Sequence, residues 1–311
     1  MKALVTGGAG FIGSHIVEGM VNRGIETRVL DNFSTGSRKN LEGIPGVEII
    51  EQDIRDYEAV REAVEGVDIV YHLAAIASVS TSVKDPVLSN QINLDGTVKV
   101  LRAAKDAGVE KVVYSGSSSA YGDSEAQPLV ESMRERPISP YAVNKMAGEH
   151  YCAVFSRIYG LETVVLRFFN VFGPRQDPAS HYSGVISLFI QKLLNKERPL
   201  IFGDGEQSRD FVYVGNVVMA SIFASVARVG GGEVFNIASA EKVTINEVLG
   251  IIRELLGLDR VKPIYREARK GDIRHSSADI SKAQKAFGYW PVIDLREGLK
   301  RTIEWYKSRS S

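Results

Sequence analysis

The sequence predicts an α/β fold: a doubly wound parallel sheet with a smaller C-terminal lobe. Strand-like and helix-like segments alternate through the first half of the chain, as expected when helical crossovers join parallel strands. The first strand runs directly into a glycine-rich turn that opens a helix. After residue 169 the alternation gives way to loop-forming segments. We therefore expect a sheet domain over residues 1–169, with a returning segment near 214–238, and a discontinuous lobe over 170–311.

The composition limits the classes of partner. The chain has 311 residues, 44% hydrophobic and 24% charged, which suits a globular protein with one large core or two lobes. Lys+Arg and Asp+Glu both number 38, so no net charge favours nucleic acid or an anionic membrane. Cys152 is the only cysteine, which rules out an intrachain disulfide and favours a reducing compartment. With no signal-like segment or membrane-length apolar run, we expect a cytoplasmic protein.

The glycine-rich turn predicts a phosphate-binding site. It follows the strand Lys2–Thr6 and precedes a helical pattern from Ser14 to Val21. In a strand-turn-helix unit, glycines allow a tight turn and the close approach of a pyrophosphate to the positive end of the helix. A plain turn is the alternative explanation for an isolated glycine triplet. The candidate contacts here are Gly7, Gly10, Phe11, Ile12 and Gly13.

A carboxylate after the second strand favours NAD over NADP. The strand Glu26–Leu30 ends at Asp31, 18 residues after Gly13. This is near the spacing at which a carboxylate binds the adenosine ribose diol. An aspartate there would repel a 2′-phosphate, although Arg38 downstream leaves NADP open.

The next strand ends offer further cofactor contacts. Asp53 and Ile54 follow the strand Val47–Ile50, and the carboxylate is placed to hold an adenine amino group. After the strand Asp68–Leu73, the small residues Ala74 and Ala75 suit either a cofactor or helix–strand packing. A long helix is expected over 86–107, where mid-helix Gly96 costs about 1 kcal/mol and predicts close packing or a kink.

Tyr141 and Lys145 are the predicted catalytic pair, at the start of a helix over 141–159. Residues four apart share a helix face, so the ammonium lies one turn from the phenol. Lowering a phenol pKa from near 10 to about 7 takes roughly 4 kcal/mol, and a nearby cation supplies much of it. Ser117, after the strand Lys111–Ser115, would hydrogen-bond the substrate oxygen. The spacing alone also occurs by chance in solvated pairs, and Pro140 and the strand supply the supporting context.

The remaining segments are expected to complete the sheet and build the lobe. Thr163–Phe168 is a sixth strand, and 234–237 returns to the sheet. Capping-box patterns at Thr244 and Asp294 each predict a helix start. A loop at 170–178, a helix at 185–194, a short strand at 199–205 and a helix after Tyr213 are expected between them.

In this order, the motifs resemble the extended short-chain dehydrogenase/reductase family over essentially the whole chain, and within it the UDP-hexose 4-epimerases. The resemblance implies a Rossmann fold that holds NAD tightly. Tyr141 would remove the 4-hydroxyl proton while hydride passes from sugar carbon 4 to the nicotinamide, and the 4-keto sugar would take the hydride back on its other face. The motifs are Thr6–Gly13, Asp31-Asn32, Asp53-Ile54, His72–Ala75, Ser115–Gly122, Tyr141 with Lys145, Arg167–Asn170 and Arg209–Phe211.

The resemblance also assigns the sites. The expected cofactor contacts are Gly7, Gly10, Phe11, Ile12, Gly13, Asp31, Asn32, Asp53, Ile54, Leu73, Ala74, Ala75, Asn93, Ser115, Tyr141, Lys145 and Phe169. Ser117 and Asn170 would contact the sugar and its diphosphate, Arg209 and Arg269 would grip the diphosphate, and Asp272 would bind a uridine ribose hydroxyl. Small Ser276 would leave room for an N-acetyl group, unless it is an uninformative surface serine. A homodimer formed by the long helices of the sheet domain is implied as well.

Two other functions fit the fold. A nucleotide-sugar 4,6-dehydratase needs an acid/base pair directly after the catalytic hydroxyl, but Ser118 and Ser119 occupy those positions. A non-catalytic NAD-sensing scaffold would typically lack the Tyr–Lys pair. The chain departs from the epimerase pattern at Ala77, where some epimerases carry a lysine, and at Gly116, where a serine is commoner. The five histidines show no metal-binding spacing, so no metal is assigned.

Overall fold

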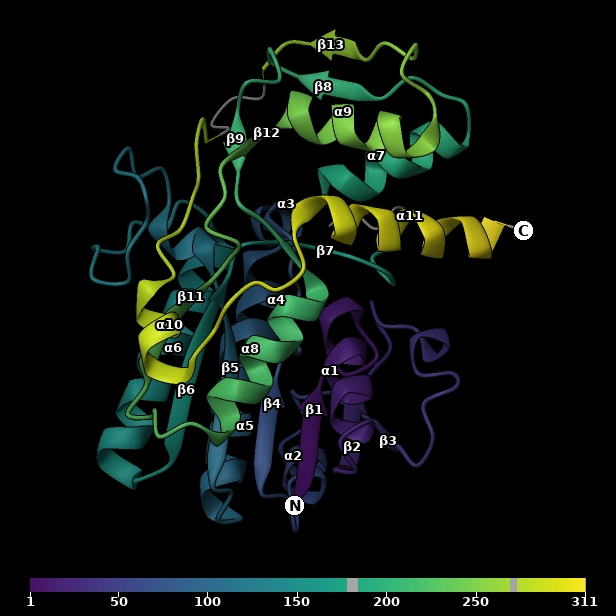
Figure 1. The fold of residues 1–311 in the computed structure, drawn as a ribbon. Coiled ribbons are helices and arrows are strands. Elements are labelled where there is room, and N and C mark those ends of the chain that lie inside the picture. The colour runs from purple at the N-terminus through teal and green to yellow at the C-terminus, as the bar shows by residue number, and fades with distance from the viewer. Residues whose placement is uncertain (178–183, 269–272, 311) are drawn as a thin grey trace.

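A seven-stranded parallel sheet forms the centre of the molecule. The computed structural model describes residues 1–177, 184–268 and 273–310 (Figure 1). The strand order β11-β6-β5-β4-β1-β2-β3 confirms the predicted fold class and the return of the late strand to the sheet. The strand order switches between β1 and β4: β2 and β3 lie on one side of β1, and β4, β5 and β6 lie on the other. The strands are β1 (Lys2–Thr6), β2 (Glu26–Asp31), β3 (Glu48–Glu51), β4 (Ile69–His72), β5 (Lys111–Ser117), β6 (Glu162–Phe168) and β11 (Glu233–Ile237).

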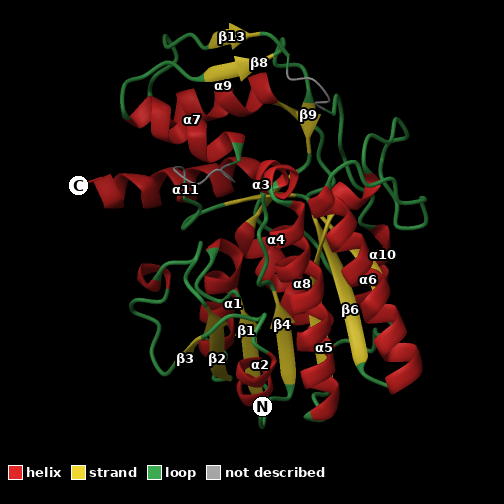
Figure 2. Cartoon of the chain, turned by 180° about the vertical axis from the view of Figure 1, so that it is seen from behind, coloured by secondary structure: helices red, strands yellow, loops and turns green. Residues whose placement is uncertain are grey.

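Helices cover both faces of the sheet because the strands are apolar on both faces. Ala3 and Val5 of β1 belong to one core with α1 (Phe11–Val21) and α8 (Val214–Val226). Leu4, between them, belongs to a second core on the other face. The helices of that face are α2 (Tyr57–Ala63), α5 (Gly96–Asp106) and α6 (Pro140–Tyr159), and Figure 2 shows the layers from behind.

The long helix expected over 86–107 is interrupted. It consists of α4 (Pro86–Asn90), a π-helical turn (Gln91–Asp95) and α5. A Cβ on Gly96 would lie 2.6 Å from Ile54 Cδ1, so the glycine allows the close packing that its position predicts. A preceding helix, α3 (Val79–Lys84), was not predicted, because its serine-rich sequence has no apolar periodicity.

The C-terminal elements form a separate core above the carboxyl ends of the sheet strands (Figure 1). The predicted helix α7 (Val185–Leu194) packs against α9 (Ile245–Leu256) and α11 (Leu295–Ser310). The capping box at Thr244 is present, and the Asp294 carboxylate accepts from Glu297 N at 2.8 Å. Short strands complete the layer: β7 (Asn170–Phe172), β8 (Leu200–Phe202), β9 (Ser208–Arg209), β10 (Phe211–Tyr213), β12 (Val243–Thr244) and β13 (Ile264–Arg266). The helix α10 (Ser281–Phe287) instead packs against β11 of the sheet (Figure 1).

The helices of the described residues were compared with the requirements for a membrane span. None of them combines the length and the apolar character needed to cross a bilayer.

Candidate active site

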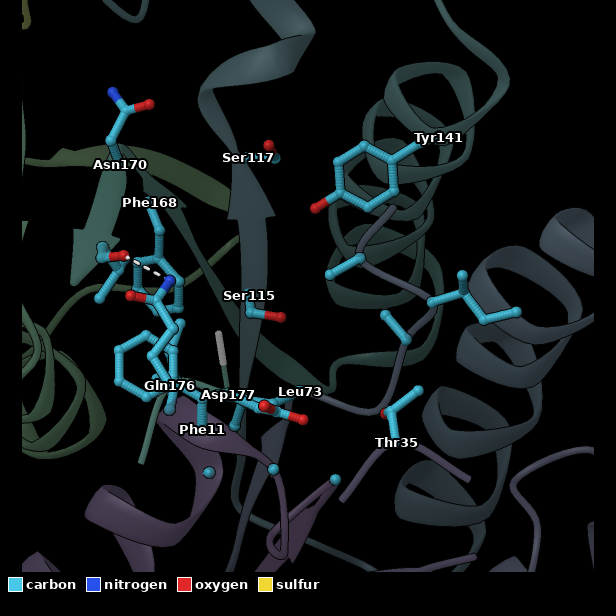
Figure 3. A pocket seen from close by; sticks show the side chains of 18 of the residues that line it. Phe11, Thr35, Leu73, Ser115, Ser117, Tyr141, Phe168, Asn170, Gln176 and Asp177 are labelled. Carbon is cyan, nitrogen blue, oxygen red and sulfur yellow. Dashed lines mark hydrogen bonds between the residues drawn. The ribbon is translucent and has the colours of Figure 1, made fainter. Parts of the chain in front are cut away.

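A cavity of about 1070 Å³ opens where the sheet meets the C-terminal layer. It follows the carboxyl ends of β1, β2, β4 and β5, where ligands bind in doubly wound folds (Figure 3). Of the predicted site residues, Arg269 and Asp272 lie outside the described residues. All the others except Asn93 line the cavity: Gly7, Gly10, Phe11, Ile12, Gly13, Asp31, Asn32, Asp53, Ile54, Leu73, Ala74, Ala75, Ser115, Ser117, Tyr141, Lys145, Phe169, Asn170, Arg209 and Ser276.

The glycine turn packs backbone against backbone. A Cβ on Gly13 would lie 2.1 Å from the Gly7 carbonyl oxygen, so α1 starts closer to β1 than any larger residue allows. Gly7 has φ +69°, and a Cβ there would lie 2.7 Å from Ala74 N. The turn thus leaves the amino end of α1 open to the cavity, and a dinucleotide pyrophosphate fits such a cradle.

Asp31 braces the same turn from β2. Its carboxylate accepts from Ala9 N at 2.9 Å and from Phe33 N at 2.8 Å, while burial raises its pKa. Arg38 does not line the cavity: its guanidinium pairs with Glu51 and lies 4.3 Å from the centre of the Phe33 ring. Glu51 is the neighbour of Asp31 in the sheet register, so Arg38 is held near the same strand end without lining the cavity.

Asp53 reaches the cavity as an ionised carboxylate. It accepts from Arg55 NH2 at 2.8 Å and from Asn32 Nδ2 at 2.8 Å. The hydrogen bonds from Arg55 are the main reason why its pKa falls to about 2. Its predicted contact with an adenine amino group stays a prediction.

Asn93 stands behind the cavity rather than on its wall. Its side chain accepts from Ile76 N at 2.7 Å and donates to Ile76 O at 3.0 Å. The amide therefore holds the loop after β4, in which Ala74, Ala75 and Ala77 line the cavity. The structure gives Asn93 a supporting contact where the sequence predicted a direct one.

Ser117 and Tyr141 meet across the cavity. Ser117 ends β5, and Tyr141 lies in the first turn of α6, where the Ser139 hydroxyl accepts from Ala142 N. The phenol of Tyr141 points across the cavity toward β5, the strand that ends at Ser117 (Figure 3). The pair thus presents two hydroxyls to one substrate oxygen.

Ser119 orients Ser117 and was missed by the sequence analysis, which considered it only as a position without a carboxylate. Its hydroxyl donates to Ser117 Oγ at 2.9 Å, and its amide donates to the same oxygen at 3.2 Å. Because Ser117 Oγ accepts twice on this side, its own proton is free to point into the cavity.

Lys145 is buried and held against β5. Its Nζ donates to Ser115 O at 2.8 Å and lies 5.0 Å from the centre of the Tyr114 ring. Burial lowers the pKa of Lys145 to about 8, opposed by Glu149. Burial raises the pKa of Tyr141. The predicted lowering of this pKa by Lys145 stays a prediction.

The opposite wall joins segments distant in sequence. Asn170 Nδ2 donates to Asp210 O at 3.0 Å, beside the predicted diphosphate ligand Arg209. Ser276 is buried and lines the cavity, and its amide donates to Ser208 O at 3.1 Å. The surface-serine alternative for Ser276 is thereby removed, while its role toward a sugar stays a prediction.

Asp210 holds this wall together and was not predicted as a site residue. Its buried carboxylate accepts from Ser239 N at 2.7 Å and from Ala278 N at 3.3 Å. Burial raises its pKa to about 7. The only sequence signal was its place in the Arg209–Phe211 motif, in which the sequence analysis assigned a role to the arginine alone.

The fold and this site define a class of nucleotide-binding enzyme. Residues 3–238 match the model of the NAD dependent epimerase/dehydratase family, and the chain belongs to that family. It is 40% identical to a putative UDP-glucose 4-epimerase of Methanocaldococcus jannaschii, over 99% of both chains.

Two solved structures are similar over nearly the whole chain. One is the UDP-N-acetylglucosamine 4-epimerase of Methanobrevibacter ruminantium in complex with UDP-N-acetylmuramic acid, with a TM-score of 0.95, 41% identity and coverage of 99% of this chain and 98% of that one. The other is the UDP-glucose 4-epimerase of Thermotoga maritima with UDP-glucose, with a TM-score of 0.95, 40% identity and full coverage of both chains.

Proposed function

We propose that the protein is an NAD-dependent UDP-hexose 4-epimerase that interconverts UDP-glucose and UDP-galactose, and also UDP-N-acetylglucosamine and UDP-N-acetylgalactosamine. The observation that carries this proposal is that Ser117 and Tyr141 line the same cavity as the glycine turn. Relatives with 4-epimerase names at 40% and 41% identity support it.

NAD fits the sheet side of the cavity. The glycine turn would hold the pyrophosphate, and Asp31 would bind the adenosine ribose. Lys145, next to Tyr141, would bind the nicotinamide ribose, and Phe169 would pack beside the nicotinamide ring. When bound, NAD supplies the hydride acceptor at sugar carbon 4 and then the hydride donor, so no net oxidation results.

The protein's own residues manage the proton. Tyr141 accepts the 4-hydroxyl proton in the forward step and returns it to the 4-keto oxygen afterwards, as a general base and then a general acid. Ser117 donates to the same sugar oxygen, because Ser119 occupies its acceptor side. The Lys145 ammonium stabilises negative charge near the phenol while Ser115 fixes its position.

The C-terminal layer would bind the nucleotide sugar, with residues 170–311 as the substrate lobe. Asn170, Arg209 and the undescribed Arg269 would bind the diphosphate, and Asp272 the uridine ribose. Ser276 would leave room for an N-acetyl group at sugar carbon 2. A dehydratase is disfavoured because the residues after Ser117 are hydroxyl-bearing serines and provide no carboxylate at that position.

An apolar surface supports the proposed homodimer. Val154 and Ile158 are 44% and 65% exposed on α6, and Val83 is 62% exposed on α3, which packs against α6. Val154→Glu/Ile158→Glu should convert a dimer into a monomer in light scattering after gel filtration, while Val226→Glu on α8 should not. A monomeric wild type would contradict the dimer. We also propose a cytoplasmic location, consistent with the single buried cysteine, Cys152.

The test of the function is product analysis. Purified protein is incubated with UDP-glucose and, separately, UDP-N-acetylglucosamine, with and without NAD, and products are resolved by anion-exchange chromatography and proton NMR. The galacto epimers without net NADH are the expected result. A 4-keto-6-deoxy sugar or accumulating NADH would overturn the proposal in favour of a dehydratase or dehydrogenase.

A further inference from the structure

A buried ion cluster lies beneath the segment that joins Ser117 to Tyr141. Arg167 of β6 is fully buried, and its Nε donates to both Glu149 carboxylate oxygens, at 3.1 and 3.0 Å. Its NH2 donates to Glu149 Oε2 at 2.6 Å and to Glu135 Oε1 at 2.8 Å. Such forked contacts fix the relative orientation of the groups that they join.

The cluster fastens the segment 118–139 to the sheet. The Arg167 guanidinium lies 4.6 Å from the centre of the Tyr121 ring, and Tyr121 OH donates to Asn236 Oδ1 at 2.7 Å. Asn236 is paired with Arg167 in the register of β11 and β6, and its Nδ2 donates to Leu129 O at 3.0 Å. Ser117 directly precedes this segment and Tyr141 follows it. Anchoring the segment therefore limits the movement of the two hydroxyls relative to each other.

Glu149 touches both catalytic elements. It lies one helical turn after Lys145 and two turns after Tyr141 on α6. A Cβ on Gly116 would lie 2.8 Å from Glu149 Oε1, so the carboxylate sits against β5 directly before Ser117. This contact gives Gly116, a departure from the commoner serine, a physical reason: it makes room for the carboxylate.

We propose that Glu149 and Arg167 are a positioning pair that fixes Ser117 against Tyr141 and keeps the Lys145 ammonium charged. The inference rests on the proposed function for its kinetic consequences. Its prediction for the pKa of Lys145 does not depend on turnover.

The groups around Lys145 define the electrostatic effect. His72 of β4 and Tyr114 of β5 face it, together with Tyr141, Glu149 and Cys152 of its own helix. Burial lowers the pKa of His72 to about 3 and raises those of Tyr114 and Cys152, so these three are neutral at pH 7. Within this set Glu149 is the carboxylate, and it raises the pKa of Lys145.

The two partners should therefore have opposite effects. Glu149→Gln removes the negative charge and leaves Arg167 with Glu135 as its carboxylate partner, which lowers the pKa of Lys145. Arg167→Met removes a buried positive charge and leaves the Glu149 charge to face Lys145, which raises the pKa of Lys145. If the pair had only a structural role, the two variants would not shift the pKa of Lys145 in opposite directions.

The experiment is a ¹³C NMR titration of the Lys145 Cε in the NAD-loaded protein, assigned with Lys145→Arg. Relative to wild type, the midpoint should fall by at least about half a unit in Glu149→Gln and rise in Arg167→Met, each unit being tenfold in proton affinity. In both variants kcat should fall at least about tenfold with KM changed less than about twofold. Glu254→Gln, which breaks the exposed pair with Arg296, is the matched control and should change neither quantity.

Equal midpoints, or midpoints that move in the same direction, would overturn the proposal. Loss of one partner of a buried pair is destabilising, so either variant can fail to fold. Gly116→Ala then tests the same claim without removing a charge: it displaces the carboxylate, and the Lys145 midpoint and kcat should both fall. An unchanged midpoint in that variant would likewise refute the pair. If wild type lacks epimerase turnover while the midpoints shift as stated, the proposed function fails and the electrostatic claim holds.

Discussion

The two walls of the cavity are built by different physical means. On the sheet side, the glycine turn is defined by backbone contacts within short stretches of chain, such as Gly7 with Gly13. On the opposite side, side chains join distant segments, such as Ser208 with His275 at 2.8 Å and Gln127 with Ser277 at 2.8 Å. The sheet wall therefore depends on sterics and the opposite wall on polar contacts between segments, and substitutions should affect the two in different ways.

The largest effect is expected where the walls meet, at Tyr141. Tyr141→Phe removes the proton acceptor and should lower kcat by about 10²–10⁴-fold, the range typical of general acid–base groups. Binding of NAD and UDP, measured by calorimetry, should stay within about twofold. Near wild-type turnover in this variant would sink the proposed mechanism.

A substitution in the sheet wall should act on the cofactor. In Gly13→Ala the new Cβ meets the Gly7 carbonyl oxygen at 2.1 Å, so the turn must open. We expect NAD to bind at least about tenfold more weakly, equivalent to about 1.4 kcal/mol, in a calorimetric titration.

Gly250→Ala in α9 is the matched control for the glycine turn. A Cβ there meets no atom within 4 Å, and alanine favours a helix by up to about 1 kcal/mol, so the melting temperature should be unchanged or higher. Equal NAD affinity in both variants would show that the backbone cradle does not set the hold on the cofactor.

A substitution in the opposite wall should act on substrate choice. Ser276→Tyr fills the cavity beside buried Ser208 and should lower kcat/KM for UDP-N-acetylglucosamine about tenfold more than for UDP-glucose, a difference of about 1.4 kcal/mol. Competition kinetics with both sugars measure the ratio directly. Equal losses on the two substrates would remove Ser276 as a size gate.

The smallest effect concerns the pH dependence of the opposite wall. Burial raises the pKa of Asp210 to about 7, so between about pH 4 and 7 the folded state binds more protons than the unfolded state. This group therefore makes the free energy of unfolding decrease as pH rises through that window.

Asp210→Asn should flatten this slope in melting experiments at pH 5 to 7. It should also lower the melting temperature, because its amide NH2 would face Ser239 N or Ala278 N, both donors. Asp259→Asn on the exposed surface should keep the wild-type slope. An unchanged slope in Asp210→Asn would contradict the role assigned to the buried carboxylate.

The sequence predicted the sheet wall well for a physical reason. Glycine spacing, strand alternation and helix caps are local signals, and they placed Gly13, Asp31 and Tyr141 on one cavity. The glycine at position 96 predicted close packing or a kink in the long helix. It did not indicate that the close neighbour would be the Ile54 side chain.

The contacts that sequence reasoning missed depend on tertiary structure. Asn93 was expected on the cavity wall, but its amide serves the backbone of Ile76. The hydrogen bonds from Lys145 Nζ to Ser115 of β5 were not predicted either. No local pattern shows that Glu149 and Arg167, on different elements, share a buried pair.

The central claim is that hydrogen leaves sugar carbon 4 and returns to the same carbon. The most direct test is turnover of UDP-[4-²H]glucose by the NAD-loaded protein in ordinary water, followed by NMR of the product. The account predicts UDP-galactose that retains deuterium at carbon 4. Loss of the label to solvent, or its appearance at another carbon, would contradict a 4-epimerase.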